Sequence, residues 1–111
     1  IYYGLCQSEK AYLAECGRLK IKSPPQFVSD GANATTHTFY NEGKTISMVC
    51  MPHDKAKIKA QIAALLVHEA AHIWQKNEQD MHMTATEDEF EAYSIQCISQ
   101  ELMLAYRPKL F

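Results

Sequence analysis

The chain has 111 residues, of which 47% are hydrophobic and 22% are charged, and its formal net charge is -2. This length suits one domain, residues 1–111, with a modest core, and the charge gives no electrostatic basis for binding nucleic acid or an anionic membrane. No apolar run approaches the ~20 residues that span a bilayer, so we expect no nucleic-acid or membrane partner.

The N-terminal half is predicted to form a helix followed by a β-hairpin. The chain starts neither with Met nor with the basic and apolar stretches of a signal peptide, which leaves open a fragment or a processed chain. Apolar residues recur near a helical period from Tyr2 to Leu19, which predicts one helix there. Residues 35–40 and 45–51 are rich in β-branched and aromatic side chains, and Asn41-Glu42-Gly43-Lys44 between them suits a hairpin.

The cysteines are interpreted as buried or partly buried thiols, with their disulfide state left open. There are four, Cys6, Cys16, Cys50 and Cys97, and none forms the C-x-x-C pattern of a cysteine zinc site. Cys6 and Cys16 are expected on the same helix, about 15 Å apart. A disulfide needs Cα atoms about 6 Å apart, so these two are not expected to pair.

Two long helices are predicted in the C-terminal half. The first has Asp54 as its N-cap and runs to about Asn77, with apolar residues at a helical period. The second runs from about Thr86 to Tyr106, where Thr86 and Glu89 have the spacing of a capping box. The order of helix, two or three strands, helix and helix indicates an α+β fold.

The first of these helices contains the sequence His68-Glu69-Ala70-Ala71-His72. Histidines four residues apart share a helix face, so both can bind one zinc ion at about 2.0–2.1 Å. Glu69 is rotated around the helix and is expected to reach the water that the metal activates, as a general base. The pattern is short, and it also fits an exposed face of an ordinary helix, but the apolar stretch Ile62–Trp74 around it argues against exposure.

A third ligand is expected from an acidic residue at the start of the last helix. Glu89 continues into a polar stripe with Tyr93, Gln96 and Gln100, which favours Glu89, while Glu91 and Asp88 remain alternatives. His82, in the loop before this helix, is a reserve candidate. Tyr93 is a candidate for steadying a ligand or an oxyanion, and its other interpretation is a half-buried core tyrosine.

Together, His68 to His72 and the later Glu89-Phe90-Glu91-Ala92 resemble the gluzincins, in particular the E-x-E-A element of the ImmA/IrrE-type peptidases. The longer stretches that contain these two elements, from Leu65 to Gln75 and from Glu89 to Gln96, also resemble small proteins encoded by tailed phages and prophages. The resemblance implies a minimal zincin-like fold with a small antiparallel sheet, one Zn²⁺ per chain, and Glu89 as the third ligand. It also implies a phage or prophage origin; the compartment stays unknown, with the bacterial host cytoplasm or the virion favoured over secretion.

Two functional hypotheses follow. The first is a zinc-dependent peptidase in which Glu69 is the base, Tyr93 assists, and a peptide or protein substrate pairs with the edge of residues 35–40 or 45–51. The second is a non-catalytic zincin-fold phage protein with a structural zinc, acting as a binding or virion-associated module. The substrate and the oligomeric state do not follow from the sequence.

Overall fold

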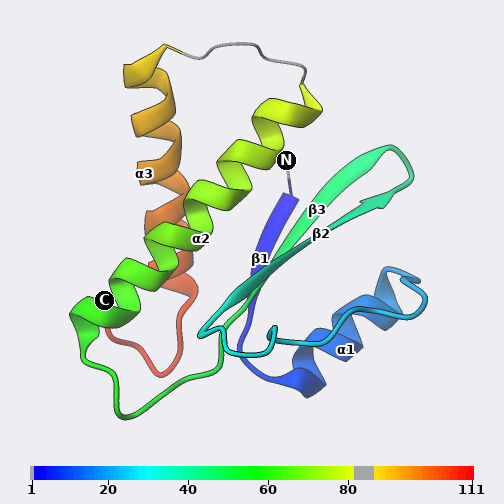
Figure 1. Ribbon diagram of the computed structural model, residues 1–111, viewed down its shortest axis with the longest axis horizontal. Coiled ribbons are helices and arrows are strands. Elements are labelled where there is room, and N and C mark those ends of the chain that lie inside the picture. Colours follow the sequence, from blue (N-terminus) through cyan, green and yellow to red (C-terminus); the bar gives the residue numbers. More distant parts are fainter. Residues whose placement is uncertain (1, 82–86) are drawn as a thin grey trace. The chain divides into compact units, whose positions relative to one another are not determined.

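The computed structural model describes residues 2–81 and 87–111 and divides the chain into two compact units, Ile1–Asp54 and Lys55–Phe111. Figure 1 shows the elements of both units, and each unit is described here by itself. The first unit contains a small sheet and one helix, and the second contains two helices. The predicted α+β class is therefore confirmed.

The first unit is built on a three-stranded mixed sheet. Its elements are β1 (Tyr2–Cys6), α1 (Glu9–Arg18), β2 (Thr35–Asn41) and β3 (Lys44–Cys50). β3 is the central strand, with β1 parallel to it on one side and β2 antiparallel on the other. The predicted hairpin is confirmed: Glu42 and Gly43 form the turn with φ values of 51° and 75°, as a type I′ turn requires.

The prediction of one helix from Tyr2 to Leu19 is wrong, because Tyr2–Cys6 forms a strand and the helix begins only at Glu9. The helix start is fixed by Ser8, whose backbone is extended and whose Oγ accepts a hydrogen bond from the N–H of Ala11 at 3.1 Å. Cys6 and Cys16 consequently do not share a helix. The expectation of an antiparallel sheet is also wrong, because the extra strand β1 joins β3 in parallel.

The core of the first unit forms around Tyr12 of α1, which is completely buried. Its hydroxyl donates a hydrogen bond to the carbonyl of Pro25 at 2.8 Å, and its ring stacks on His37 of β2 with centroids 5.3 Å apart. His37 in turn hydrogen-bonds to the carbonyl of Phe27 at 3.0 Å. These contacts join α1, β2 and the long connection between them.

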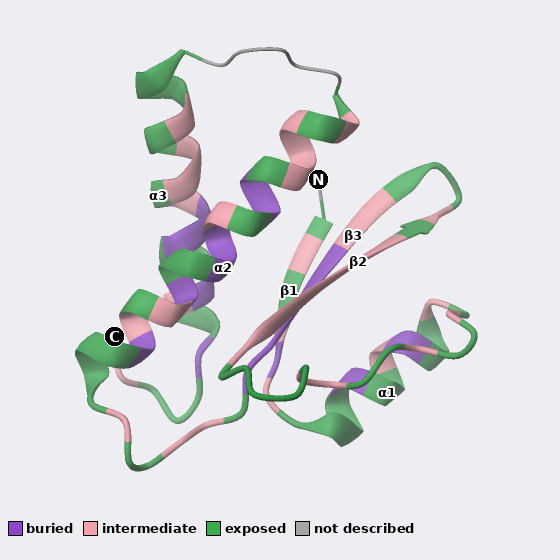
Figure 2. Cartoon of the chain, viewed as in Figure 1, coloured by how far each residue is buried: buried purple, intermediate pink, exposed green. Residues whose placement is uncertain are grey.

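The second unit is a pair of packed helices, α2 (Lys59–Asp80) and α3 (Asp88–Ala105). Trp74 of α2 meets Phe90 of α3 edge to face, with ring centroids 5.6 Å apart. Figure 2 shows buried segments along each helix. Leu66 on α2 and Leu102 on α3 are among the buried residues. Within residues 2–81 and 87–111, neither of these helices nor α1 has the combination of length and apolarity needed to cross a membrane.

Both helices begin later than predicted. Asp54 is not the N-cap of α2; the N-cap is Ile58, whose N–H donates to Oε1 of Gln61 at 2.9 Å. The N-cap of α3 is Glu87. Thr86, which the sequence assigned to the start of this helix, lies outside the described residues. Both helices are therefore shorter at their N-terminal end than predicted. The predicted metal-binding motif still lies within α2.

Candidate metal centre

Helix α2 brings His68 and His72 together on its exposed surface. The residues lie one turn apart, and their Nε2 atoms are 3.1 Å from each other. The two rings are nearly perpendicular in a T-shaped arrangement, with centroids 4.7 Å apart and an interplanar angle of 81°. The fold therefore contains the histidine pair on one face of a helix, as the sequence predicted. Both side chains are exposed, so the argument that the apolar stretch around them speaks against exposure is wrong.

The spacing of this pair fits two ligands of one zinc ion. Two nitrogens at about 2.0–2.1 Å from a tetrahedral metal are about 3.3 Å apart. The observed 3.1 Å is close to that value. Neutral imidazole is a common zinc ligand, and two such groups supply half of a tetrahedral shell.

Glu69 lies beside the histidines on the buried side of α2. It is only 4% exposed, in contrast with its two histidine neighbours. At roughly 100° per residue, it is rotated about 100° from His68 and about 60° from His72. It shares a stripe with the buried residues Leu66 and Ile73. A carboxylate next to two histidines that could hold a metal is a candidate general base, as the sequence predicted.

The third ligand stays a prediction. Glu89 and Asp88 are exposed at the start of α3, and Glu91 is half-buried. Over residues 2–81 and 87–111, no group of three or more His, Cys, Asp or Glu side chains lies close enough together to hold a metal ion. The reserve candidate His82 lies outside the described residues.

The phase of α3 separates the acidic candidates. Ile98 marks its buried side, and at roughly 100° per residue Glu91 lies about 20° from Ile98 while Glu89 lies about 180° away. Glu91 is therefore on the packed side of α3 and Glu89 on its exposed side. This placement keeps Glu91 open as the alternative ligand, beside the Glu89 that the resemblance implies.

Tyr93 lies on the exposed side of α3 and is 62% exposed. The polar stripe formed by Glu89, Tyr93, Gln96 and Gln100 is exposed throughout. The interpretation of Tyr93 as a half-buried core residue is therefore wrong, and its role near a metal stays a prediction.

A pocket in the first unit was missed by sequence reasoning. It has a volume of about 610 Å³ and is lined by residues of β1, α1 and the β2–β3 hairpin, including Cys6. The error followed from reading Tyr2–Cys6 as helix. The signal that would have found the strand is Ser8, a strong N-cap residue that places the helix start after Cys6.

Comparison with models of known protein families, with curated proteins and with solved structures finds no match to this chain.

Proposed function

We propose that the protein binds one zinc ion per chain through His68 and His72 and acts as a zinc-dependent peptidase. The observation that carries this proposal is the 3.1 Å separation of the two Nε2 atoms on α2, close to the spacing of two zinc ligands. In this proposal Glu89 is the third ligand, as the resemblance to gluzincins implies, with Glu91 and Asp88 as alternatives; among the described residues none of these three groups with the histidine pair, so the ligand would have to approach the pair when zinc binds. The zincin-like fold is part of the same proposal.

A zinc ion at this site supplies Lewis acidity, which polarises a peptide carbonyl and makes water more acidic. Glu69 takes the proton of the attacking water and then delivers it to the leaving amine. Tyr93 donates a hydrogen bond to the developing oxyanion. Of the two strand edges considered for the substrate, only β2 remains, because β3 is paired on both sides.

A second candidate is a non-catalytic zinc-binding module of a phage protein, in which zinc is structural or binds a partner. The observation that favours it is the burial of Glu69, which is only 4% exposed. A base must come within about 2.6–3.2 Å of the proton that it removes, directly or through one water. A helix that only presents two exposed histidines needs no such access.

The experiment combines metal analysis with peptide cleavage. Purified wild type should carry about one zinc per chain, and His68→Ala or His72→Ala should lose it. Glu69→Gln keeps size and hydrogen-bonding capacity, so it should retain zinc and folding while zinc-dependent cleavage of a peptide mixture falls roughly 10²–10⁴-fold. Gln75→Ala, an exposed change one turn farther along α2, is the matched control and should keep both zinc and cleavage.

The possible results separate the hypotheses. Full zinc occupancy in both histidine variants contradicts the metal site. Zinc in wild type without any chelator-sensitive cleavage supports the second candidate. If Glu69→Gln lost zinc outright, Glu69 would be a ligand and both candidates would fail.

A further inference from the structure

Three of the four cysteines gather in the core of the first unit. Cys6, at the end of β1, Cys16 in α1 and Cys50 at the end of β3 pack in one cluster with Tyr12 and Met48. None of the four cysteines forms a disulfide in this structure. The cluster belongs to a different unit from His68 and His72 and plays no part in the proposed zinc chemistry.

Within this cluster, Cys6 and Cys50 are direct neighbours in the sheet. Their Cα atoms are partners in the parallel ladder between β1 and β3. Neighbouring strands lie about 4.8 Å apart, which falls inside the ~4.4–6.8 Å between Cα atoms that a disulfide allows. The hydrogen bonding extends one residue beyond Cys50, because the carbonyl of Cys6 accepts a hydrogen bond from the N–H of Met51 at 3.0 Å. The strand pairing therefore places the two Cα atoms at a spacing that suits a bridge.

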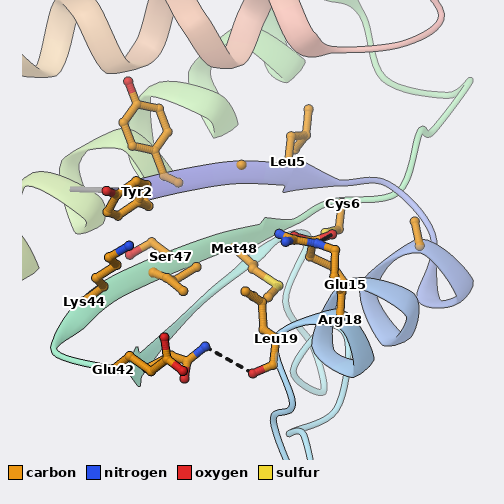
Figure 3. A pocket seen from close by; sticks show the side chains of 15 residues that line it. Tyr2, Leu5, Cys6, Glu15, Arg18, Leu19, Glu42, Lys44, Ser47 and Met48 are labelled. Atoms are coloured by element: carbon orange, nitrogen blue, oxygen red, sulfur yellow. Dashed lines mark hydrogen bonds and ion pairs between the residues drawn. The ribbon is translucent and has the colours of Figure 1, made fainter.

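The pocket of about 610 Å³ gives access to one of these two thiols. Figure 3 shows Cys6 among the residues that line it, together with Met48 and the Glu15–Arg18 ion pair of α1. Neither Cys16 nor Cys50 is among the lining residues. Cys6 is 8% exposed and Cys50 is completely buried. Of the two cysteines, Cys6 is therefore the one that a small reagent in this pocket would reach first.

Electrostatics also distinguish the thiols. The hydrogen bond with Cys50 lowers the pKa of Cys6, and this outweighs burial and the Glu15 carboxylate, which both act to raise it. The pKa of Cys16 is raised, mainly by burial, although its hydrogen bond with Tyr12 acts in the opposite direction. The thiolate is the form that attacks disulfides, so Cys6 is the better nucleophile of the two.

We propose that Cys6 and Cys50 are a redox-active pair, in which Cys6 attacks low-molecular-weight disulfides that enter the pocket and Cys50 resolves the product. The Cys6 thiolate bonds to one sulfur of the small disulfide, whose S–S bond breaks and releases a first thiolate that takes up a proton. Cys50 then loses its proton to water and bonds to Cys6 Sγ, which displaces the second small thiol. Two protein thiols are thereby oxidised to one disulfide, and one small disulfide is reduced to two thiols.

The test treats the folded full-length chain with hydroxyethyl disulfide, a small neutral probe, and maps the products by mass spectrometry after alkylation of the remaining thiols. Wild type should lose two hydrogen atoms and yield a Cys6–Cys50 linked peptide. Cys50→Ala should stop at a mixed disulfide on Cys6. Cys6→Ala should slow modification of Cys50 roughly tenfold or more, because the accessible nucleophile is gone. Cys16→Ala is the matched control, a buried thiol of the same cluster, and should behave as wild type.

Several results would overturn the proposal. One is a main disulfide product in which Cys16 replaces Cys6 or Cys50. Another is modification of Cys50 in Cys6→Ala at the same rate as in wild type. The third is a Cys6–Cys50 disulfide that forms only when the protein is unfolded in urea. Circular dichroism checks that each variant is folded. If Cys6→Ala does not fold, Cys6→Ser takes its place, and the peptide map of wild type decides the identity of the bridge without any variant.

Discussion

Zinc should stabilise helix α2 against unfolding, and the histidine pair should account for that effect. An ion that bridges His68 and His72 ties two successive turns of the helix and requires the helical geometry that holds their Nε2 atoms 3.1 Å apart. The unfolded chain does not maintain this spacing. Zinc therefore binds the folded state more tightly than the unfolded chain, and this difference raises the free energy of unfolding.

The size of this effect follows from linkage. At a free zinc concentration 100-fold above the dissociation constant, the free energy of unfolding rises by about 2.7 kcal/mol. With a urea m-value of about 1–3 kcal/mol/M, the midpoint of unfolding moves up by roughly 1–3 M. Either histidine replaced by alanine leaves one nitrogen of the pair, and most of this shift should disappear.

The single tryptophan of the chain provides the assay. Trp74 is two residues beyond His72 and is 5% exposed, so its fluorescence reports the unfolding of this part of α2. Urea curves with zinc and with chelator are compared for wild type, His68→Ala and His72→Ala. Gln75→Ala, exposed on the same helix, should keep the full zinc shift. An equal zinc shift in wild type and both histidine variants, or tight zinc binding to wild type with no shift, would refute the reasoning.

Three further predictions concern other parts of the chain. Ser8→Ala should lower the free energy of unfolding, measured in urea, by about 1 kcal/mol, because it removes the N-cap of α1. Ser8→Gly should lower it by only a few tenths of a kcal/mol. Equal decreases in the two variants would contradict the capping role. Glu89→Ala should lower zinc affinity in a chelator competition more than Glu91→Ala does, and the reverse order would transfer the ligand role to Glu91. Burial, followed by the Cys16 thiol, raises the pKa of Tyr12, so this residue contributes stability that is present below about pH 10 and is lost as the pH rises further. Between about pH 8 and about pH 11, the free energy of unfolding measured in urea should therefore fall less for Tyr12→Phe than for wild type. An equal fall in both proteins would exclude ionisation of Tyr12 as a cause of the pH dependence.

The parts of the fold that could be predicted from the sequence are encoded locally. The hairpin follows from Asn41-Glu42-Gly43-Lys44 between two β-rich stretches, and Gly43 takes the positive φ that the turn needs. Helix α2 follows from a long apolar period, and the four-residue spacing of His68 and His72 already specifies a shared helix face. The histidine pair was predictable for the same reason.

The parts that were missed depend on contacts between distant residues. Tyr2 and Leu5 have a spacing that suits a helix, and five residues are too few to separate helix from strand by periodicity. The parallel pairing of β1 with β3 joins residues more than forty positions apart, such as Tyr2 and Ile46, and no local pattern specifies it. The Cys6–Cys50 contact depends on that pairing. The choice between Glu89 and Glu91 likewise depends on which side of α3 is packed.

Glu69 is the residue on which the two functional hypotheses differ. Burying a carboxylate costs free energy even when it is paired, and an apolar side chain of similar volume is often as stable or more so in such a place. Leucine at this position would extend the buried stripe of Leu66 and Ile73. Catalytic hydrogen bonds in free enzymes are often long or poorly aligned and tighten only with substrate, so an exposure of 4% is compatible with a base. Loss of cleavage with zinc retained in Glu69→Gln would therefore assign the role of base to Glu69, and unchanged cleavage in that variant would leave Glu69 a passive buried group.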